Sequence, residues 1–323
     1  MTNFQVYKKI LSFSILDFFV GLVALAILVG LSTAGYFIAN QSTDMALIGL
    51  AVGFVIGIIV CVLISYLVSN RIKAAQIAMM VKGVTEGNLP DHTFAEGFKE
   101  IRGRFGKITV FFFITNIIKG IFNQLGRAMN RFGNAVGGQV GGSITSVIDG
   151  AIQTLVAYLC DCCLGWILYR KEENAFKAGC EGTVIFFKHG KTLLRNVGRI
   201  FGMGLLSLVV IGGAMFGVLY LIFMQFPQMF VSLSNEIIEI STREGGEVPE
   251  FFQNPTTFMI FVAAIGAIVI WSMFHSMLIR PFILTGVMRN FMAAGIADIP
   301  SEKDFAMLDS KSSKFRKLHA NAQ

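Results

Sequence analysis

Charged residues are scarce in this chain, and their scarcity excludes most soluble folds. Only 15% of the 323 residues are Asp, Glu, Lys or Arg, whereas an average soluble domain has about 25%. Hydrophobic residues make up 54% of the chain, and several apolar runs reach the ~20 residues that cross a bilayer. The sequence therefore predicts an integral membrane protein without a large soluble domain.

Motifs of catalysis and of cofactor binding are also missing. The sequence contains no nucleophile elbow, HExxH pair, P-loop or dinucleotide fingerprint. We therefore expect no enzymatic activity and no cofactor. The net charge of +7 does not indicate nucleic-acid binding, because membrane proteins collect Lys and Arg in their cytoplasmic loops.

The cysteines form neither a disulfide framework nor a metal motif. Their number is odd, and none lies in a segment expected outside the cell. Three of the five cluster in Cys160-Asp161-Cys162-Cys163, but this spacing is not that of a structural zinc site. We expect small apolar thiols inside a membrane helix and no bound metal, with S-palmitoylation near the inner interface as a further possibility.

Four membrane spans are clear from hydropathy, at residues 15–39, 45–68, 201–226 and 258–278, the first two joined by the polar loop Asn40–Asp44. Basic residues dominate the linkers 70–107 and 170–199 and the tail 280–323, whereas loop 227–257 is acidic. The positive-inside rule places the basic segments and both termini in the cytoplasm and the acidic loop outside. We expect a multi-pass protein of the plasma (inner) membrane.

The middle of the chain allows two arrangements. Residues 143–169 are a further candidate span, and since both linkers are cytoplasmic it needs a partner, for which 108–122 is available. That pairing leaves Lys119, Arg127 and Arg131 on the outer side, against the positive-inside rule. In the alternative, 108–142 lies in the interface or re-enters, with its Gly-rich turn buried in protein.

The predicted fold class is an all-α polytopic transmembrane bundle, forming one membrane domain over residues 1–323. It has about six spans, of which the third is atypical or re-entrant. Both cytoplasmic linkers also contain amphipathic helical patterns, with phenylalanines alternating with charges. We expect these helices to lie on the inner membrane surface, with basic faces toward anionic lipid.

Two carboxylates in the fourth predicted span are the main functional candidates. Asp149 and Asp161 are twelve residues apart, which puts them roughly 120° apart on a helix of ~100° per residue, so they do not form a carboxylate pair. Gln153 lies one turn from Asp149, and Tyr158 lies on the side of Asp161. A carboxylate at bilayer depth costs at least ~2.5–3.5 kcal/mol and therefore needs a partner or a function.

Basic side chains that could pair with these acids lie nearby in the sequence. Lys119, Arg127 and Arg131 precede the acids, and Asp17 and Arg280 are expected at similar depth at the inner ends of their spans. Two interpretations stay open for each acid. It forms a buried structural ion pair, or it lines a pathway for a substrate, a cation or a proton.

Glycines recur at every fourth residue in three segments. They are Gly49, Gly53 and Gly57 in the second span, Gly133, Gly137 and Gly141 before the acids, and Gly213 and Gly217 in the fifth span. Such spacing creates a flat groove for close helix packing, in a tight bundle or in an oligomer. At Gly133–Gly141 a hinge or broken helix is the alternative to packing.

The second half of the chain resembles the C-terminal half of the choline transporter-like family. The similarity covers about Gly133–Leu318, and the segments that carry it are Gly137–Ile144, Cys160–Cys163, Asn174–Gly179, Lys191–Asn196 and the tail from Met288 to Ser313. The long N-terminal half of that family is missing here, and Arg280-Pro-Phe-Ile-Leu-Thr-Gly286 replaces its acidic pair after the last span. The resemblance implies a similar topology and favours transport, and it assigns no binding residues.

Two functional hypotheses follow. The first is a transporter or channel for a small solute or a lipid headgroup, with a route past the glycine break and the two acids, for which a cation is the natural ligand. The second is a non-transporting scaffold or assembly subunit of a larger membrane complex, in which glycines pack partner helices and the acids pair with basic residues. Expected partners are the bilayer, anionic lipid at the cytoplasmic face, and a second copy or another membrane subunit.

Overall fold

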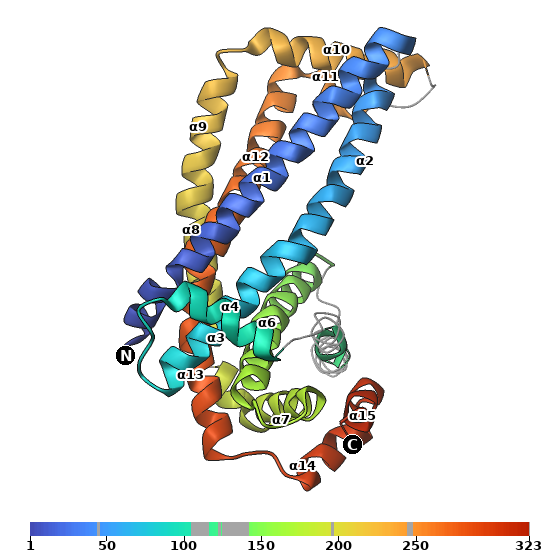
Figure 1. Cartoon of the computed structure of the whole chain (residues 1–323). Helices are drawn as coiled ribbons and strands as arrows, with labels where there is room; N and C mark the ends of the chain where they lie inside the picture. Colours follow the sequence, from blue (N-terminus) through green and yellow to red (C-terminus); the bar gives the residue numbers. More distant parts are fainter. Residues whose placement is uncertain are drawn as a thin grey trace. The chain divides into compact units, whose positions relative to one another are not determined.

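The computed structural model describes residues 1–43, 46–104, 116–121, 124, 142–194, 197–243 and 248–322. Helix makes up 89% of the structure, and these described ranges contain no strand. The predicted all-α class is confirmed. The chain divides into two compact units (Figure 1): unit 1 comprises Met1–Ile200 and Arg280–Gln323, and unit 2 comprises Phe201–Ile279.

Four helical stretches are long and apolar enough to cross a membrane: Asn3–Ala39, Ile48–Thr85, Gly202–Phe223 and Pro255–Ala297. They coincide with the four clear predicted spans, as expected of an integral membrane protein. The two further predicted spans are not among them. Of residues 108–122 the structure describes only 116–121, and within 143–169 the apolar helix among the fully described residues is Val156–Tyr169.

The first two apolar helices of unit 1 form a close hairpin (Figure 1) of α1 (Asn3–Thr43) and α2 (Ala46–Ile64). Because α1 continues to Thr43, residues 40–43 are helical, and the prediction of a loop there was wrong. The hairpin is close because glycines face the partner helix. A Cβ added at Gly49 would lie 2.2 Å from the carbonyl oxygen of Gly35, and one at Gly53 would lie 2.2 Å from that of Leu31.

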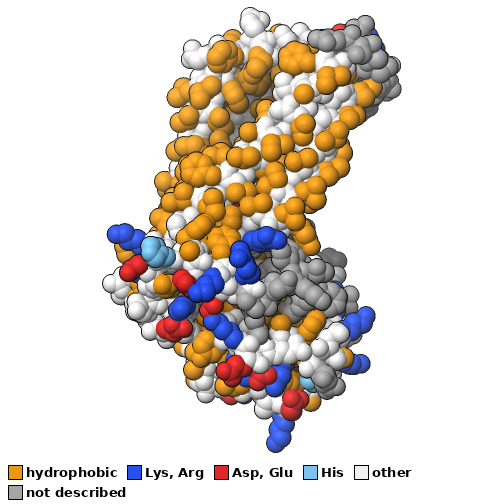
Figure 2. All heavy atoms as spheres, in the orientation of Figure 1, with side chains coloured by type: hydrophobic (Ala, Val, Ile, Leu, Met, Phe, Trp, Pro, Cys, Tyr) orange, Lys and Arg blue, Asp and Glu red, His pale blue; other side chains and the backbone are white. Residues whose placement is uncertain are grey.

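The outward surface of this hairpin is apolar. Most of its large hydrophobic side chains remain exposed, including Phe19, Val29, Val55 and Val62. Figure 2 shows hydrophobic side chains covering α1 and α2, whereas Lys, Arg, Asp and Glu gather over the other helices of unit 1. An apolar surface of this extent on a long helix pair fits contact with lipid.

The other helices of unit 1 form a packed helical body. They are α3 (Asn70–Thr85), α4 (Thr93–Arg104), α6 (Gly142–Tyr169), α7 (Ala175–Leu194), α13 (Arg280–Ala297), α14 (Glu302–Lys311) and α15 (Ser313–Ala320). α6 packs against α3, α7 and α13, and Trp166, Met288 and Phe291 are fully buried. From Tyr158 onward α6 is buried almost all round, which is typical of a helix at the centre of a protein core.

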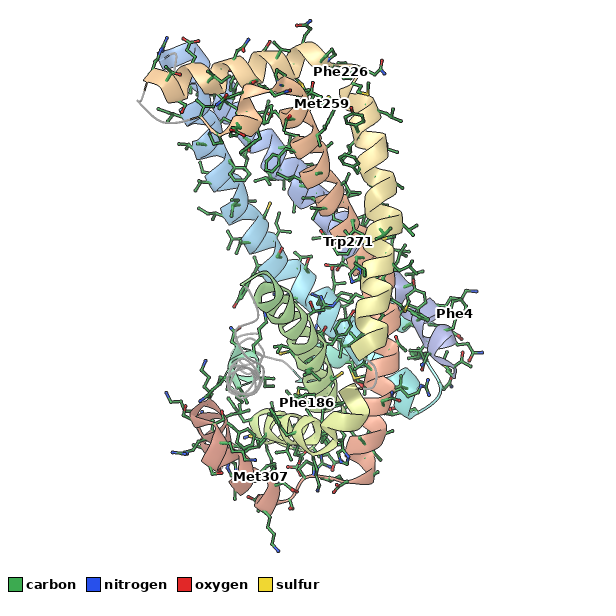
Figure 3. All side chains as sticks on the ribbon, turned by 180° about the vertical axis from the view of Figure 1, so that it is seen from behind. Phe4, Phe186, Phe226, Met259, Trp271 and Met307 are labelled. Carbon is green, nitrogen blue, oxygen red and sulfur yellow. The ribbon has the colours of Figure 1, made fainter. Side chains whose placement is uncertain are left out.

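The C-terminal helices close one side of this body. Ser301 and Asp304 form a capping box at the start of α14, in which the backbone N–H and the hydroxyl of Ser301 donate to Asp304 Oδ2 at 2.8 and 2.9 Å. α14 and α15 pack on α7, and Phe305 and Phe315 are buried. Figure 3 labels Phe186 on α7 and Met307 on α14. The predicted cytoplasmic tail is therefore folded and helical.

Unit 2 contains the end of α8 (Val197–Ser207), α9 (Gly213–Phe223), α10 (Pro227–Arg243), α11 (Glu250–Gln253) and α12 (Pro255–Phe274). Phe230 on α10 packs with Phe258 and Met259 on α12, and Met259 is labelled in Figure 3. A Cβ added at Gly213 or Gly217 would meet no atom within 4 Å among the residues described. The amphipathic helix α10 makes up much of the predicted loop 227–257.

Three π-helical segments interrupt the long apolar stretches: η1 (Ser65–Ser69), η2 (Leu208–Gly212) and η3 (His275–Ile279). In unit 2 the π-turns border a polar contact. Ser207 Oγ accepts a hydrogen bond from Trp271 Nε1 at 3.2 Å and lies 3.2 Å from His275 Nδ1. Short π-segments are frequent at functional sites, and here they accommodate buried polar groups inside apolar helices.

Candidate functional site

The centre of the candidate site is an ion pair between α6 and α13. Arg280 Nη2 donates a hydrogen bond of 2.6 Å to Asp161 Oδ2, and the two side chains are 22% and 15% exposed. From sequence, Lys119, Arg127 and Arg131 are candidate partners of Asp161, and Asp17 is the candidate partner of Arg280; Arg127 and Arg131 lie outside the described residues. Among the described residues the partner of Asp161 is the first residue of α13, because α6 and α13 pack side by side.

Tyr158 extends the site by one turn along α6. The Arg280 guanidinium lies 5.8 Å from the centre of the Tyr158 ring, within the range of a cation–π contact. The Tyr158 side chain is only 2% exposed, and its hydroxyl has no hydrogen-bond partner among the described residues. A buried hydroxyl without a partner costs free energy, so it marks either a functional group or a position that binds something further.

A second cation, Lys73 on α3, lies within electrostatic range of this pair. Its strongest electrostatic interaction is repulsion by Arg280, followed by attraction to Asp161 and Asp17. Lys73 is half-buried, and no described group accepts a hydrogen bond or forms an ion pair with its ammonium. Sequence analysis missed Lys73 because it was counted among the many basic residues of the cytoplasmic linker.

Asp17 on α1 completes the arrangement. Its Oδ1 atom is buried and has no hydrogen-bond partner in the part of the chain that the structure describes, although the carboxylate interacts electrostatically with Lys73 and Arg280. Lys119, in the helical residues 116–121, adds a third cation within range of Lys73. We call the set Asp17, Lys73, Lys119, Asp161 and Arg280, together with Tyr158, the charge cluster. It has three cations and two acids.

The other predicted site residues are not brought to this cluster by the described structure. Asp149 and Gln153 belong to the helical part of α6, but their side chains lie outside what is described. Arg127, Arg131, Gly133, Gly137 and Gly141 lie outside the described residues altogether.

A second buried ionic group lies between α6 and α7. The Glu181 carboxylate, 2% exposed, accepts hydrogen bonds from Trp166 Nε1 at 2.8 Å and from Arg170 Nε at 3.1 Å. This hydrogen bonding raises the pKa of Arg170. Sequence analysis missed Glu181, although an acid on the apolar face of a helix was the available signal. Because its donors complete its hydrogen bonding, we assign this group to packing.

The five cysteines are free thiols. Cys160, Cys162, Cys163 and Cys180 are buried in unit 1, and burial raises the pKa of the Cys180 thiol. Within the described ranges, no three His, Cys, Asp or Glu side chains are grouped so that they could hold a metal ion.

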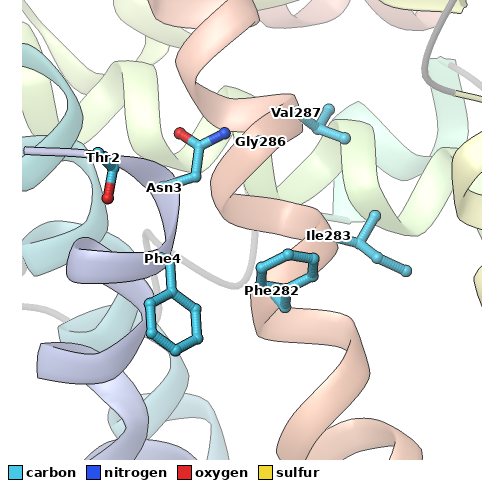
Figure 4. A pocket seen from close by; sticks show the side chains of 7 residues that line it. All are labelled: Thr2, Asn3, Phe4, Phe282, Ile283, Gly286 and Val287. Atoms are coloured by element: carbon cyan, nitrogen blue, oxygen red, sulfur yellow. The ribbon is translucent and has the colours of Figure 1, made fainter.

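A cavity of about 270 Å³ lies between the start of α1 and α13 (Figure 4). Phe4 and Phe282 form its apolar side, and Asn3 its polar side. Arg289 Nη2 donates to the Met1 carbonyl at 2.8 Å, and the Arg289 side chain also bonds Asn3. These bonds fix the N-terminus on α13, and the cavity adds no charged lining group.

Comparisons with known proteins found no match for this chain, either among family models, among curated proteins or among solved structures. The functional argument therefore depends on the chain's own residues.

Proposed function

We propose that this protein is a multi-pass membrane transporter or channel that holds a small solute or a lipid headgroup at the charge cluster. The observation that carries the proposal is the set of unpartnered polar groups around the Asp161–Arg280 pair. A purely structural pair would be expected to have its neighbouring polar groups satisfied. Here the Tyr158 hydroxyl and Asp17 Oδ1 are both buried, and neither has a hydrogen-bond partner within the described ranges.

For the topology we propose four crossings with both termini in the cytoplasm, in place of the six spans expected from sequence. Gly120 lies against the side chain of Lys314, and Ser312 Oγ donates to Gln124 Oε1 at 3.0 Å. If the C-terminal tail is cytoplasmic, a segment that contacts it is cytoplasmic too, so 108–122 does not cross. α6 then does not cross either, since crossings between two cytoplasmic linkers come in pairs.

This arrangement also removes the conflict with the positive-inside rule. Lys119, Arg127 and Arg131 then belong to the cytoplasmic side, together with the other basic residues of the linkers. The charge cluster falls where the inner ends of α1 and of the Ile48–Thr85 helix enter the helical body. Polar groups at that depth are within reach of headgroups and of cytoplasmic solutes.

The resemblance to the choline transporter-like family supports transport but does not identify the substrate. The basic excess of the charge cluster supports an anionic or zwitterionic ligand over a simple cation. Asp161, the acid that would attract a cation, is already paired with Arg280.

Flux measurements on the full chain in liposomes test the transport proposal. The probes are radiolabelled choline, radiolabelled inorganic phosphate and a fluorescent phospholipid whose leaflet exchange is followed by chemical quenching. We expect flux of at least one probe, and its loss in Asp161→Asn and in Asp149→Asn while both variants still insert and stay monodisperse. Wild-type liposomes that pass none of the probes would contradict the proposal.

The alternative function is a scaffold subunit of a membrane complex. The tight α1–α2 packing at Gly49 and Gly53 and the exposed apolar surface of the hairpin favour it. In that case Asp161→Asn would reduce expression or release a co-purifying membrane partner, and no probe would be transported by the wild type.

A further inference from the structure

We propose that the charge cluster is a phosphate-binding site, occupied by the phosphate group of a lipid headgroup or of a small solute. The proposal rests on the proposed function for the position of the cluster at the inner membrane surface, and it adds the chemical class of the ligand.

The balance of charge at the cluster favours an anion. Among the described residues the cluster contains three cations, Lys73, Lys119 and Arg280, and two acids, Asp17 and Asp161, so one positive charge is left over. The strongest electrostatic effect on Lys73 is repulsion by Arg280. An anion bound between two cations removes such repulsion, which is why clusters of Arg and Lys recur at phosphate sites.

The free hydrogen-bond donors of the cluster also suit a phosphate. Arg280 uses one N–H group on Asp161, and its other guanidinium donors have no partner among the described residues. The Lys73 ammonium is likewise free of described acceptors, and the buried Tyr158 hydroxyl has no partner. A phosphate presents several strong acceptor oxygens and can engage donors from all three side chains at once.

The remaining group of the cluster is the carboxylate oxygen Oδ1 of Asp17. It determines which phosphate-containing ligand fits the site best. It is a buried acceptor without a donor, and beside an anion it needs a hydrogen bond from the ligand. A headgroup hydroxyl, an amine or a protonated phosphate oxygen can supply one. A quaternary ammonium cannot, because it carries no N–H. Phosphatidylglycerol therefore fits the site better than phosphatidylcholine, and inorganic phosphate is the soluble candidate.

Two substitutions test the site without removing a hydrogen bond between described residues. Neither the Lys73 ammonium nor the Tyr158 hydroxyl has a hydrogen-bond partner among these residues, and for Lys73 the repulsion by Arg280 comes before the attraction to Asp161 and Asp17. Lys73→Gln and Tyr158→Phe should therefore leave the unliganded protein about as stable as the wild type. Each should weaken ligand binding, Lys73→Gln on the order of tenfold because a charge-assisted hydrogen bond is lost. The matched control is Lys99→Gln, since Lys99 is an exposed lysine on α4.

The experiment measures thermal unfolding of the purified full chain in detergent, titrated with phosphatidylglycerol, with phosphatidylcholine, or with inorganic phosphate against chloride at equal ionic strength. A rise in Tm with phosphatidylglycerol alone assigns the site to a lipid headgroup, and a rise with inorganic phosphate assigns it to a solute. In both cases the rise should be lost or halved in Lys73→Gln and Tyr158→Phe and kept in Lys99→Gln.

Two results would overturn the proposal. One is the absence of any phosphate-dependent rise in Tm in the wild type. The other is an equal rise in the wild type and in Lys73→Gln and Tyr158→Phe, which would place the effect on the basic surface in general. Phosphate binding without flux in liposomes would refute the transport proposal and support the phosphate site. Flux without phosphate-dependent stabilisation would support transport and refute the phosphate site.

Discussion

Asp161 and Arg280 are 119 residues apart in the chain, and their side chains meet at 2.6 Å. The pair joins α6 to the first residue of α13 and so connects the middle of the chain to its last long helix. The surroundings of the two charges differ, because Arg280 also interacts with Lys73 and with the ring of Tyr158. This asymmetry is what separates the pair from an ordinary structural salt bridge.

Breaking the ion pair should destabilise unit 1. In Arg280→Gln or Asp161→Asn one partly buried charge loses its partner, so we expect a loss of about 1–3 kcal/mol in the free energy of unfolding. The double variant Asp161→Arg with Arg280→Asp should recover part of the loss. Thermal unfolding in detergent measures each step. The control is Glu239→Gln, which removes an exposed pair with Arg243 and should change stability by less than about 0.5 kcal/mol.

If the exchanged pair regains stability but not flux or phosphate binding, the geometry of the charges matters for function as well as for folding. If the single variants are as stable as the wild type, the pair does not hold α6 to α13.

Gly53→Ala should open the α1–α2 hairpin. The new Cβ would lie 2.2 Å from the Leu31 carbonyl oxygen, and because a backbone atom cannot move aside, the helices must separate. Overpacking of this kind typically costs about 1–3 kcal/mol. Gly213→Ala is the matched control, since an added Cβ there meets nothing within 4 Å among the described residues. Unfolding temperature and monodispersity by gel filtration report the outcome, and equal behaviour of the two variants would refute the close contact.

The topology can be tested with cysteines introduced one at a time and a membrane-impermeant maleimide. We expect Arg131→Cys and Ala322→Cys to react from the same side of sealed vesicles, and Glu239→Cys from the opposite side. Four of the five native cysteines are buried, so the unmodified protein supplies a low background. Labelling of Arg131→Cys from the side of Glu239→Cys would restore the six-span arrangement.

The start of α14 should depend on pH. Hydrogen bonds from the backbone and the hydroxyl of Ser301, together with the nearby Lys188, lower the pKa of Asp304 below its usual value. A carboxyl with a lowered pKa in the folded state stabilises the fold above its unfolded pKa of about 3.9, and this contribution is lost as the pH falls through the lower, folded value. The protection factors of the α14 amides, which compare each exchange rate with the intrinsic rate at the same pH, should therefore fall toward pH 3.

Asp304→Asn removes the titrating group, so the protection factors of its α14 amides should be lower than those of the wild type at pH 6 and should change less on acidification. An unchanged difference between pH 6 and pH 3 in this variant would assign the effect to another carboxyl.

The sequence by itself determined the helical class, the membrane character and the four long apolar helices. Each depends on local properties that a single segment carries: enough consecutive apolar residues to span a bilayer, and few charges within them. It also pointed to Asp161, Tyr158, Asp17 and Arg280 as candidates, because a charge or a buried polar group in an apolar segment needs an explanation wherever it occurs.

Only the tertiary structure decided which of these residues meet. Whether Arg280 faces Asp17 or Asp161 depends on how α1, α6 and α13 pack, and hydrophobic periodicity does not encode the choice of partner helix. The same packing brought Lys73 beside Arg280 and placed Glu181 between Trp166 and Arg170. Lys73 looked like one basic residue among many because its significance comes from a neighbour about 200 residues away in the chain, and that neighbour becomes adjacent only when the helices assemble.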